Sequence, residues 1–80
     1  MNNGRTTGKD FFNEYVEKLN CGDTFQTYQV RDYINRRSMF ENDKHMFPMD
    51  QTLTRYFRER RENKGDIALK DHAKSIYMKV

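Results

Sequence analysis

The stretch MFPMDQTLTRYFRERREN, residues 46–63, determines how the rest of the chain can be arranged. Pro48 favours the start of a helix, because its fixed φ suits a first turn in which its missing N–H is not needed. Asp50 then places negative charge near the positive end of the helix dipole. Apolar residues recur at the spacing of one helical face, at Met49, Leu53, Tyr56 and Phe57. The pattern predicts an amphipathic helix over residues 48–63, followed by Gly65 at its C-terminal end.

The opposite face of this helix carries long polar side chains with hydroxyl residues beside them. Its members are Gln51, Thr52, Thr54, Arg55, Arg58 and Glu62. Long hydrogen-bond donors and small hydroxyl groups suit the edges of bases in a DNA groove. An ordinary solvated face would have the same composition. The surrounding sequence therefore has to decide between the two interpretations.

Charge and composition point to a small folded domain with a basic surface. The chain has 80 residues, 35% of them apolar, with six Phe and five Tyr available for a core. Fifteen Lys and Arg residues oppose twelve acids, which gives a net charge of +3. Five cations and two acids lie between Arg55 and Lys64, and Arg36 and Arg37 form a second basic pair. A clustered basic surface is typical of nucleic-acid binding.

The single cysteine and the hydropathy exclude several other classes. Cys21 rules out an internal disulfide and any multi-cysteine zinc site, and we expect it to be at least half-buried near a helix end. No apolar run approaches the roughly 18 residues of a membrane span, and no signal-peptide core follows Met1. We therefore expect a cytoplasmic protein that does not contact a membrane.

The N-terminal half predicts a flexible arm, two helices and a short strand. Residues 1–8 are polar and form the arm, and residues 9–80 form the domain. Residues 9–20 form a helix with an acidic outer face, whose inner face carries Phe11, Phe12, Tyr15, Val16 and Leu19.

The next segment predicts a single short edge strand over residues 24–26. Thr27 is a candidate N-cap for a helix over residues 28–37, with Val30, Tyr33 and Ile34 facing inward. Arg36 and Arg37 would either complement the dipole of that helix or contact phosphate.

The remaining segments are a connection and a hairpin. The connection could extend the second helix through Phe40 and then turn at residues 41–43. In residues 38–47 we expect the apolar side chains to be mostly buried: Met39, Phe40, Met46 and Phe47. After Gly65 the apolar residues alternate, which predicts a β-hairpin with its turn at residues 71–74. In the second strand we expect Ile76, Met78 and Val80 to cover the core. Lys70, His72 and Lys74 would lie at the hairpin tip.

This order of elements resembles the winged helix-turn-helix family, an α+β fold of three helices, a short strand and a C-terminal two-stranded β-hairpin wing. The resemblance covers about residues 9–80 and is carried by TFQT at 24–27, PMDQTLTRYFR at 48–58, GDI at 65–67 and SIYM at 75–78. In that family the third helix enters the major groove and the wing lies over neighbouring backbone. The resemblance implies base contacts from Gln51, Thr52 and Arg55, flanked by Thr54 and Arg58. It also implies backbone contacts from the wing and flanks, at Lys70, His72, Lys74, Arg36 and Arg37. The ten residues at 38–47 exceed the usual turn of about three or four residues.

We therefore predict sequence-specific binding of double-stranded DNA by a small transcriptional or replication-accessory regulator of bacterial, plasmid or phage origin. Such modules often act as homodimers on two half-sites, and Phe11, Phe40 and Tyr77 are candidates for the dimer interface. The alternatives are a protein-interaction module, such as a phage-encoded inhibitor of a host protein, and binding of structured RNA. His45 and His72 have no metal-ligand spacing, and no phosphate-binding loop or nucleophile motif occurs. We expect no catalysis and no cofactor.

Overall fold

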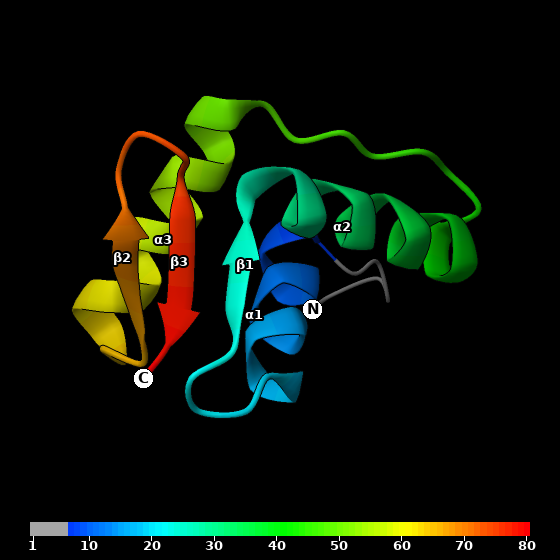
Figure 1. The fold of residues 1–80 in the computed structure, drawn as a ribbon. Coiled ribbons are helices and arrows are strands. Elements are labelled where there is room, and N and C mark those ends of the chain that lie inside the picture. Colours follow the sequence, from blue (N-terminus) through cyan, green and yellow to red (C-terminus); the bar gives the residue numbers. More distant parts are fainter. Residues whose placement is uncertain (1–6) are drawn as a thin grey trace.

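A three-stranded antiparallel sheet and three helices make up residues 7–80, the part of the chain that this computed structural model describes. The helices are α1 (Gly8–Lys18), α2 (Thr27–Asn42) and α3 (Asp50–Asn63), and the strands are β1 (Thr24–Gln26), β2 (Ile67–Asp71) and β3 (Ile76–Lys79). Figure 1 shows α1 and α3 behind the sheet, with α3 behind the β2–β3 hairpin, while α2 continues from the end of β1 and extends past that edge of the sheet. The predicted α+β class is confirmed. Of the predicted N-terminal arm, residues 1–6 lie outside the described residues.

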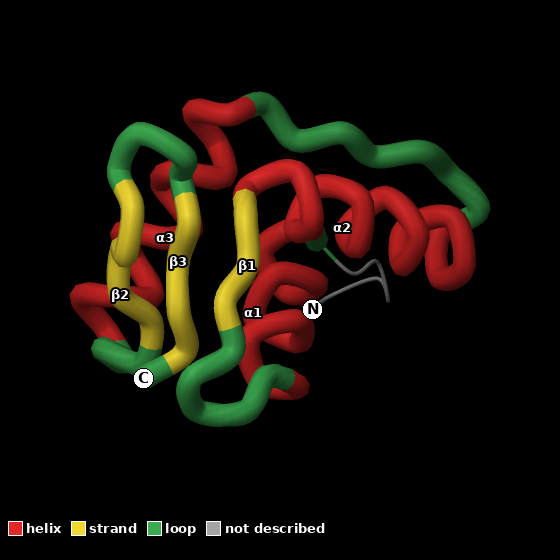
Figure 2. The backbone as a smooth tube through the Cα atoms, in the orientation of Figure 1, coloured by secondary structure: helices red, strands yellow, loops and turns green. Residues whose placement is uncertain are grey.

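The strand order β1-β3-β2 places β3 in the centre of the sheet (Figure 2). β1 pairs with β3 through Phe25 and Tyr77, and β2 pairs with β3 through Ile67 and Lys79. The short strand therefore lies at an edge, as predicted. The order helix, short strand, helix, helix and C-terminal hairpin forms a topology compatible with a winged helix.

The ends of α1 and α3 follow from local hydrogen bonds. Thr7 caps α1, since its side chain accepts from the Asp10 N–H at 3.2 Å while the Asp10 carboxylate accepts from the Thr7 N–H. α3 begins at Asp50, two residues later than predicted, because Pro48 and Met49 are held in an extended segment before it. At the other end, Gly65 has φ 64° and donates its N–H to the Arg60 carbonyl at 3.0 Å. This left-handed end confirms the predicted role of Gly65.

The predicted start of α2 was wrong, and its end agrees with the alternative in which the helix extends beyond Arg37 through Phe40. Its N-cap is Gln26 rather than Thr27, and the Gln26 N–H donates to the Gln29 side chain at 2.8 Å. The helix continues five residues beyond Arg37 and ends at Asn42, before Asp43 in a left-handed conformation. Arg36 and Arg37 therefore lie inside the helix. Their interaction with its dipole is excluded as an explanation, because the dipole acts within the last turn.

The core lies between the sheet and the helices, and it confirms most of the inward stripes predicted for the three helices. The exception is Met49, which was predicted on the inward stripe of α3 and is 68% exposed. Its buried members are Phe11, Phe12, Val16, Phe25, Val30, Ile34, Leu53, Phe57, Ile67 and Tyr77. The Phe57 ring lies at the centre, 5.2 Å from the Phe12 ring and 4.5 Å from the Tyr77 ring. Phe11 and Tyr77 are buried, so neither can belong to the predicted dimer interface. Phe40, the third candidate for that interface, is exposed.

The face of β3 was predicted incorrectly. Tyr77 is the buried side chain, whereas Ile76 and Met78 are half-buried and Val80 is exposed. Tyr77 pairs with Phe25 of β1, and their rings stack at 5.7 Å on the core side of the sheet. Pairing of these two aromatic residues buries more apolar area than the opposite face would.

Apolar residues of the connection were predicted to be mostly buried, and most of them are not. Phe40 is 80% exposed and Phe47 64% exposed; Met39 is also exposed, and Met46 is the half-buried one that packs on the core. Met39 and Phe40 lie on the exposed face of α2, which continues to Asn42. Residues 43–49 run back along the outside of α2 to reach α3, which leaves Phe47 exposed (Figures 1 and 2). The predicted burial of Cys21 is also wrong, since Cys21 is exposed in the turn before β1.

Candidate nucleic-acid interface

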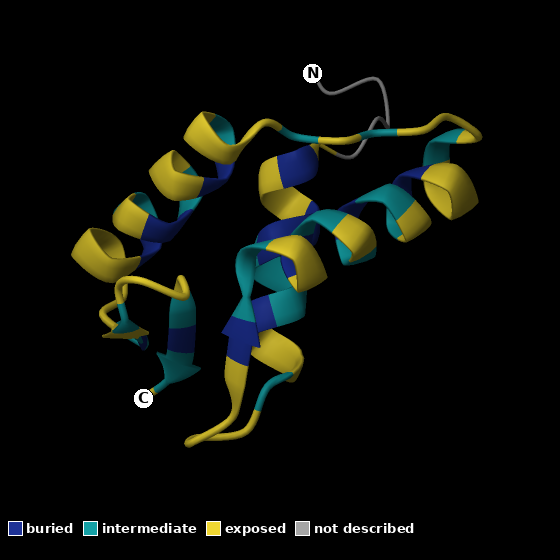
Figure 3. Ribbon diagram, turned by 45° about the horizontal axis from the view of Figure 1, so that its top comes forward, coloured by how far each residue is buried: buried dark blue, intermediate teal, exposed yellow. Residues whose placement is uncertain are grey.

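The outer face of α3 is polar and exposed, as its spacing predicted. Leu53 and Phe57 turn inward, so the opposite side of the helix meets solvent (Figure 3). Gln51, Thr54, Arg55 and Arg58 are exposed there, while Thr52 is half-buried. Four of the five predicted third-helix site residues are therefore accessible to a ligand.

The hairpin presents a second set of polar side chains beside α3. Lys70 lies in β2, and His72 and Lys74 lie in the turn, all three exposed. α3 packs against β2, and Thr54 of α3 lines the same groove as Lys74 and Ser75 of the hairpin turn. The structure thus places the predicted wing next to the predicted recognition helix.

A groove with a volume of about 330 Å³ joins the two elements. It is lined by Gln26, Thr27, Tyr28, Arg31, Asp50, Thr54, Lys74 and Ser75. The Gln26 side-chain amide donates to the Lys74 carbonyl at 3.2 Å and so holds the hairpin turn against the start of α2. Thr54 and Lys74, predicted from separate segments, meet in this groove.

The two flanks of α3 differ in charge. Successive residues advance by about 100° around the helix, so Thr54, Arg58 and Arg61 lie on the side of the hairpin. On the opposite flank Glu59 forms a salt bridge of 2.8 Å with Lys9 of α1. That hydrogen bond from Lys9 is the main reason why the pKa of Glu59 lies below its ordinary value, and Arg55 and Arg58 add to it. Arg61 was missed by sequence reasoning, although its spacing from Thr54 and Arg58 could have identified it.

The cations divide into paired and unpaired groups. Within residues 7–80, seven Lys and Arg side chains make neither a salt bridge nor a hydrogen bond: Lys44, Arg55, Arg58, Arg61, Lys64, Lys70 and Lys74. All except Lys44 lie on α3, at its C-cap or on the hairpin. The unpaired positive charge is therefore concentrated at the predicted interface.

Arg60 belongs to the scaffold, although its position in the basic run suggested a surface role. Its side chain is 5% exposed and donates to Asp66 at 2.7 and 2.9 Å and to Asn13 at 3.0 Å. The hydrogen bond from Arg60 is also the main cause that lowers the pKa of Asp66. This arginine links α3 to α1 and to the start of β2, and it cannot reach a ligand.

Arg36 and Arg37 lie away from α3 and the hairpin. Arg37 donates to Glu14 of α1 at 2.8 Å and to Glu41 at 3.1 Å, so it connects two helices. Hydrogen bonds from Tyr33 and then from Arg37 lower the pKa of Glu14. Arg36 pairs with Asp32 at 3.0 Å on the outer side of α2. The structure does not bring these two residues together with the rest of the predicted site.

Comparison with known proteins gives no relative: no protein-family model, no curated protein and no solved structure matches the chain. Within residues 7–80, no helix combines the length and the apolar composition needed to cross a membrane. The same residues hold no cluster of three or more His, Cys, Asp or Glu side chains that could bind a metal ion.

Proposed function

We propose that this chain binds double-stranded DNA in a sequence-specific manner, through the outer face of α3 and the β2–β3 hairpin. A small regulator of transcription or an accessory protein of replication, from a bacterium, plasmid or phage, is the role that fits such a module. The observation that supports it is the concentration of unpaired cations on α3 and the hairpin. An unpaired, exposed cation can bind phosphate without first breaking an ion pair, and it releases counterions from the DNA when it does so.

Each element would have a separate task in the complex. Gln51, Thr54 and Arg55 on the first half of α3 would contact base edges in the major groove. Contacts to the backbone would come from Arg58, Arg61, Lys70, His72 and Lys74. Thr52 is half-buried, and Arg36 and Arg37 are already paired with acids. We therefore leave these three out of the proposed surface.

We expect affinity for duplex DNA to fall about a hundredfold or more between 50 and 200 mM salt, for some four to six phosphate contacts. The measurement is a mobility-shift titration on random duplex at several salt concentrations, with structured RNA as the comparison. Replacing Lys70 and Lys74 together by Gln should weaken every duplex equally and make the slope shallower by about two. A flat salt response, or tighter binding of RNA, would refute the proposal.

Arg55 and Arg58 should have different effects on specificity. A bidentate arginine–guanine contact contributes about 1–3 kcal/mol of discrimination against the wrong base. We expect Arg55→Ala to keep the fold, weaken the best site and relax the preference at one base-pair position. Arg58→Ala should weaken the selected site and a scrambled duplex by similar factors. Titrations of each variant on both duplexes decide this, after the best site has been selected from a random library. Equal losses on both duplexes for Arg55→Ala would assign Arg55 to phosphate.

A homodimer on two half-sites would raise the affinity of so small a module. Phe40 is the exposed aromatic residue left from the predicted dimer interface, and Met49 and Phe47 are exposed apolar residues beside the path of the connection. The same exposed residues favour a second candidate function, binding of a protein partner, because aromatic residues and Met are enriched in the buried centres of protein interfaces. Sedimentation of the free protein and of its DNA complex distinguishes self-association from a requirement for another protein.

A further inference from the structure

We propose that Asp50, the first residue of α3, recognises the amino group of a cytosine in the major groove, and that Arg31 of α2 is its positioning residue. The inference rests on the proposed function and adds to it a contact that determines specificity. Its basis is an acid within a basic interface. Asp50 lines the groove of about 330 Å³ between α3 and the hairpin, together with Thr54 and Lys74, and it is the one acid among the eight lining residues.

The Asp50 carboxylate is exposed on the part of α3 that would enter the major groove. Its side chain is 81% exposed. Asp50 and Thr54 are four residues apart, so they lie one turn apart on the same face of the helix. A duplex that brings base edges to Thr54 therefore brings them close to Asp50 as well.

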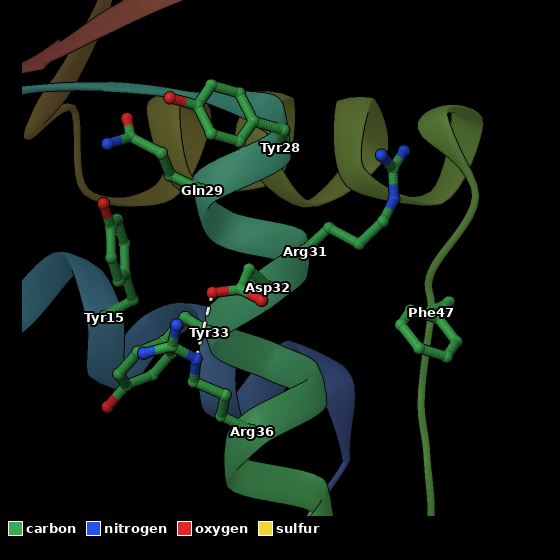
Figure 4. A pocket seen from close by; sticks show the side chains of 8 residues that line it. All are labelled: Tyr15, Tyr28, Gln29, Arg31, Asp32, Tyr33, Arg36 and Phe47. Carbon is green, nitrogen blue, oxygen red and sulfur yellow. Dashed lines mark ion pairs between the residues drawn. The ribbon is translucent and has the colours of Figure 1, made fainter.

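Arg31 fixes the direction of this carboxylate. Its Nε donates to the Pro48 carbonyl at 2.9 Å, and its guanidinium also donates to Asp50 Oδ1. Figure 4 shows the Arg31 side chain extending from α2 toward the segment that leads into α3. An ionised carboxylate has two acceptor oxygens with about four acceptor sites. Within residues 7–80 no hydrogen bond reaches Asp50 Oδ2. One oxygen is therefore held by Arg31, and the other is available to a ligand.

The negative charge selects the group that Asp50 can contact on DNA. A carboxylate repels phosphate, so Asp50 is not suited to a backbone contact. In the major groove only cytosine and adenine present an amino group as donor. Adenine also presents its N7 acceptor beside that group, which a carboxylate would repel, whereas cytosine presents the amino group alone. Asp50 should therefore favour cytosine, and its pairing with Arg31 lowers the cost of bringing an acid to DNA.

Asp50→Ala should change specific and non-specific binding in opposite directions. We expect the preference for cytosine at one base-pair position to fall by about tenfold. Affinity for a scrambled duplex should instead rise by about twofold, because one negative charge leaves the interface. The measurement is selection of sites from a random duplex library by the wild type and the variant, followed by titrations on the best site, on its three single-base variants at the relaxed position, and on the scrambled duplex.

Asp50→Asn gives a second and sharper test, because asparagine pairs with adenine through its amide. At the position where Asp50→Ala loses its preference, Asp50→Asn should change the preferred base from cytosine to adenine. Glu62→Ala is the matched control, since it removes an exposed acid from α3 outside the groove lining. That control should leave the preference at every position unchanged.

The positioning role of Arg31 is tested separately. Arg31→Lys keeps the charge, but an ammonium group lacks the planar guanidinium that binds the Pro48 carbonyl and Asp50 together. We expect this variant to weaken the same cytosine preference and to leave the other positions unchanged. In the Asp50→Ala background, Arg31→Lys should have no further effect on that position. A general loss of affinity on every duplex would assign Arg31 a structural role only.

The outcomes separate this inference from the proposed function. Equal changes on all duplexes for Asp50→Ala, or relaxation at a position where the wild type prefers a base other than cytosine, would overturn the contact from Asp50. The proposed function would survive that result, because the wild type would still discriminate between duplexes. A wild type that binds all duplexes alike, or none, would refute the proposed function and this inference with it.

Discussion

Phe57→Ala is expected to lower the free energy of unfolding by about 3–5 kcal/mol, the usual cost of truncating a buried phenylalanine. The Phe57 side chain is 1% exposed. Its ring contacts those of Phe12, Phe25 and Tyr77, which belong to α1, β1 and β3. No single element can move to fill the cavity without losing its own contacts. The loss should therefore lie toward the upper part of that range.

Such a loss is large for a domain of this length. At roughly 0.05–0.15 kcal/mol per residue, 80 residues give a total stability of about 4–12 kcal/mol. The melting temperature, measured by circular dichroism, should fall by at least about 12 °C, and the variant could unfold entirely. Phe40→Ala is the matched control, since the same change at an exposed ring should cost within about 0.5 kcal/mol. Similar melting temperatures for the two variants would show that the inward face of α3 has been assigned incorrectly.

Helix faces were predictable because the period repeats over several turns. In α1 and α3 the apolar residues recur often enough to fix one inward side, and Phe12, Leu53 and Phe57 are buried as that pattern requires. The positions of Pro48 and Gly65 also placed the ends of α3 to within two residues. Local sequence was therefore sufficient to predict the number and order of the helices and the face of each that packs on the core.

The hairpin shows where periodicity fails. β3 has four residues, and both of its faces carry large apolar or aromatic side chains, so alternation alone does not tell which face is inside. The choice depends on Phe25, about fifty residues earlier in the chain, because its ring stacks on Tyr77. A contact between segments so far apart leaves no local signal in either of them.

The connection between α2 and α3 was misread because its apolar residues suggested burial. Its path is fixed instead by polar side chains of α2 that bind its backbone. The Ser38 hydroxyl donates to the Lys44 carbonyl at 2.7 Å, the Asn35 amide oxygen accepts from the Met46 N–H at 2.9 Å, and Arg31 holds Pro48. Hydrogen bonds of this kind depend on geometry, and composition does not reveal them.

Most of the candidate site on α3 follows from the same helical period, but the division of its arginines does not. Arg58, Arg60 and Arg61 form one basic run, yet Arg60 is buried and the other two are exposed. Arg60 differs from the other two because the fold brings two hydrogen-bond acceptors to it. They are Asp66, directly before β2, and Asn13 in α1. A basic run can thus contain both scaffold and surface residues.

Replacing Arg60 by Met should therefore destabilise the domain, by about 3 kcal/mol. Met keeps the unbranched stem of the side chain and removes the guanidinium, so the change removes the ion pair with Asp66 and the hydrogen bond to Asn13. Breaking a buried ion pair typically costs about 3–5 kcal/mol. We expect the lower end, because the Asp66 side chain keeps 22% exposure and the Lys79 Nζ lies 3.8 Å from it. The measurement is urea unfolding at pH 7, with Arg55→Met as the exposed control on the same helix. That control should change stability by less than about 0.5 kcal/mol.

The pH dependence distinguishes loss of the ion pair from loss of packing. Arg60 lowers the pKa of Asp66 below its ordinary value of 3.8, so the folded state binds fewer protons at this carboxyl than the unfolded chain does. The stabilisation is complete above pH 3.8 and is lost as the pH falls through the lowered pKa of the folded state. The difference in stability between wild type and Arg60→Met should therefore narrow as the pH falls below 3.8. In an Asp66→Asn background the same substitution should cost less and show little dependence on pH. A difference that stays constant across this range would assign the cost of Arg60→Met to packing, because protonation of Asp66 would then have no part in it.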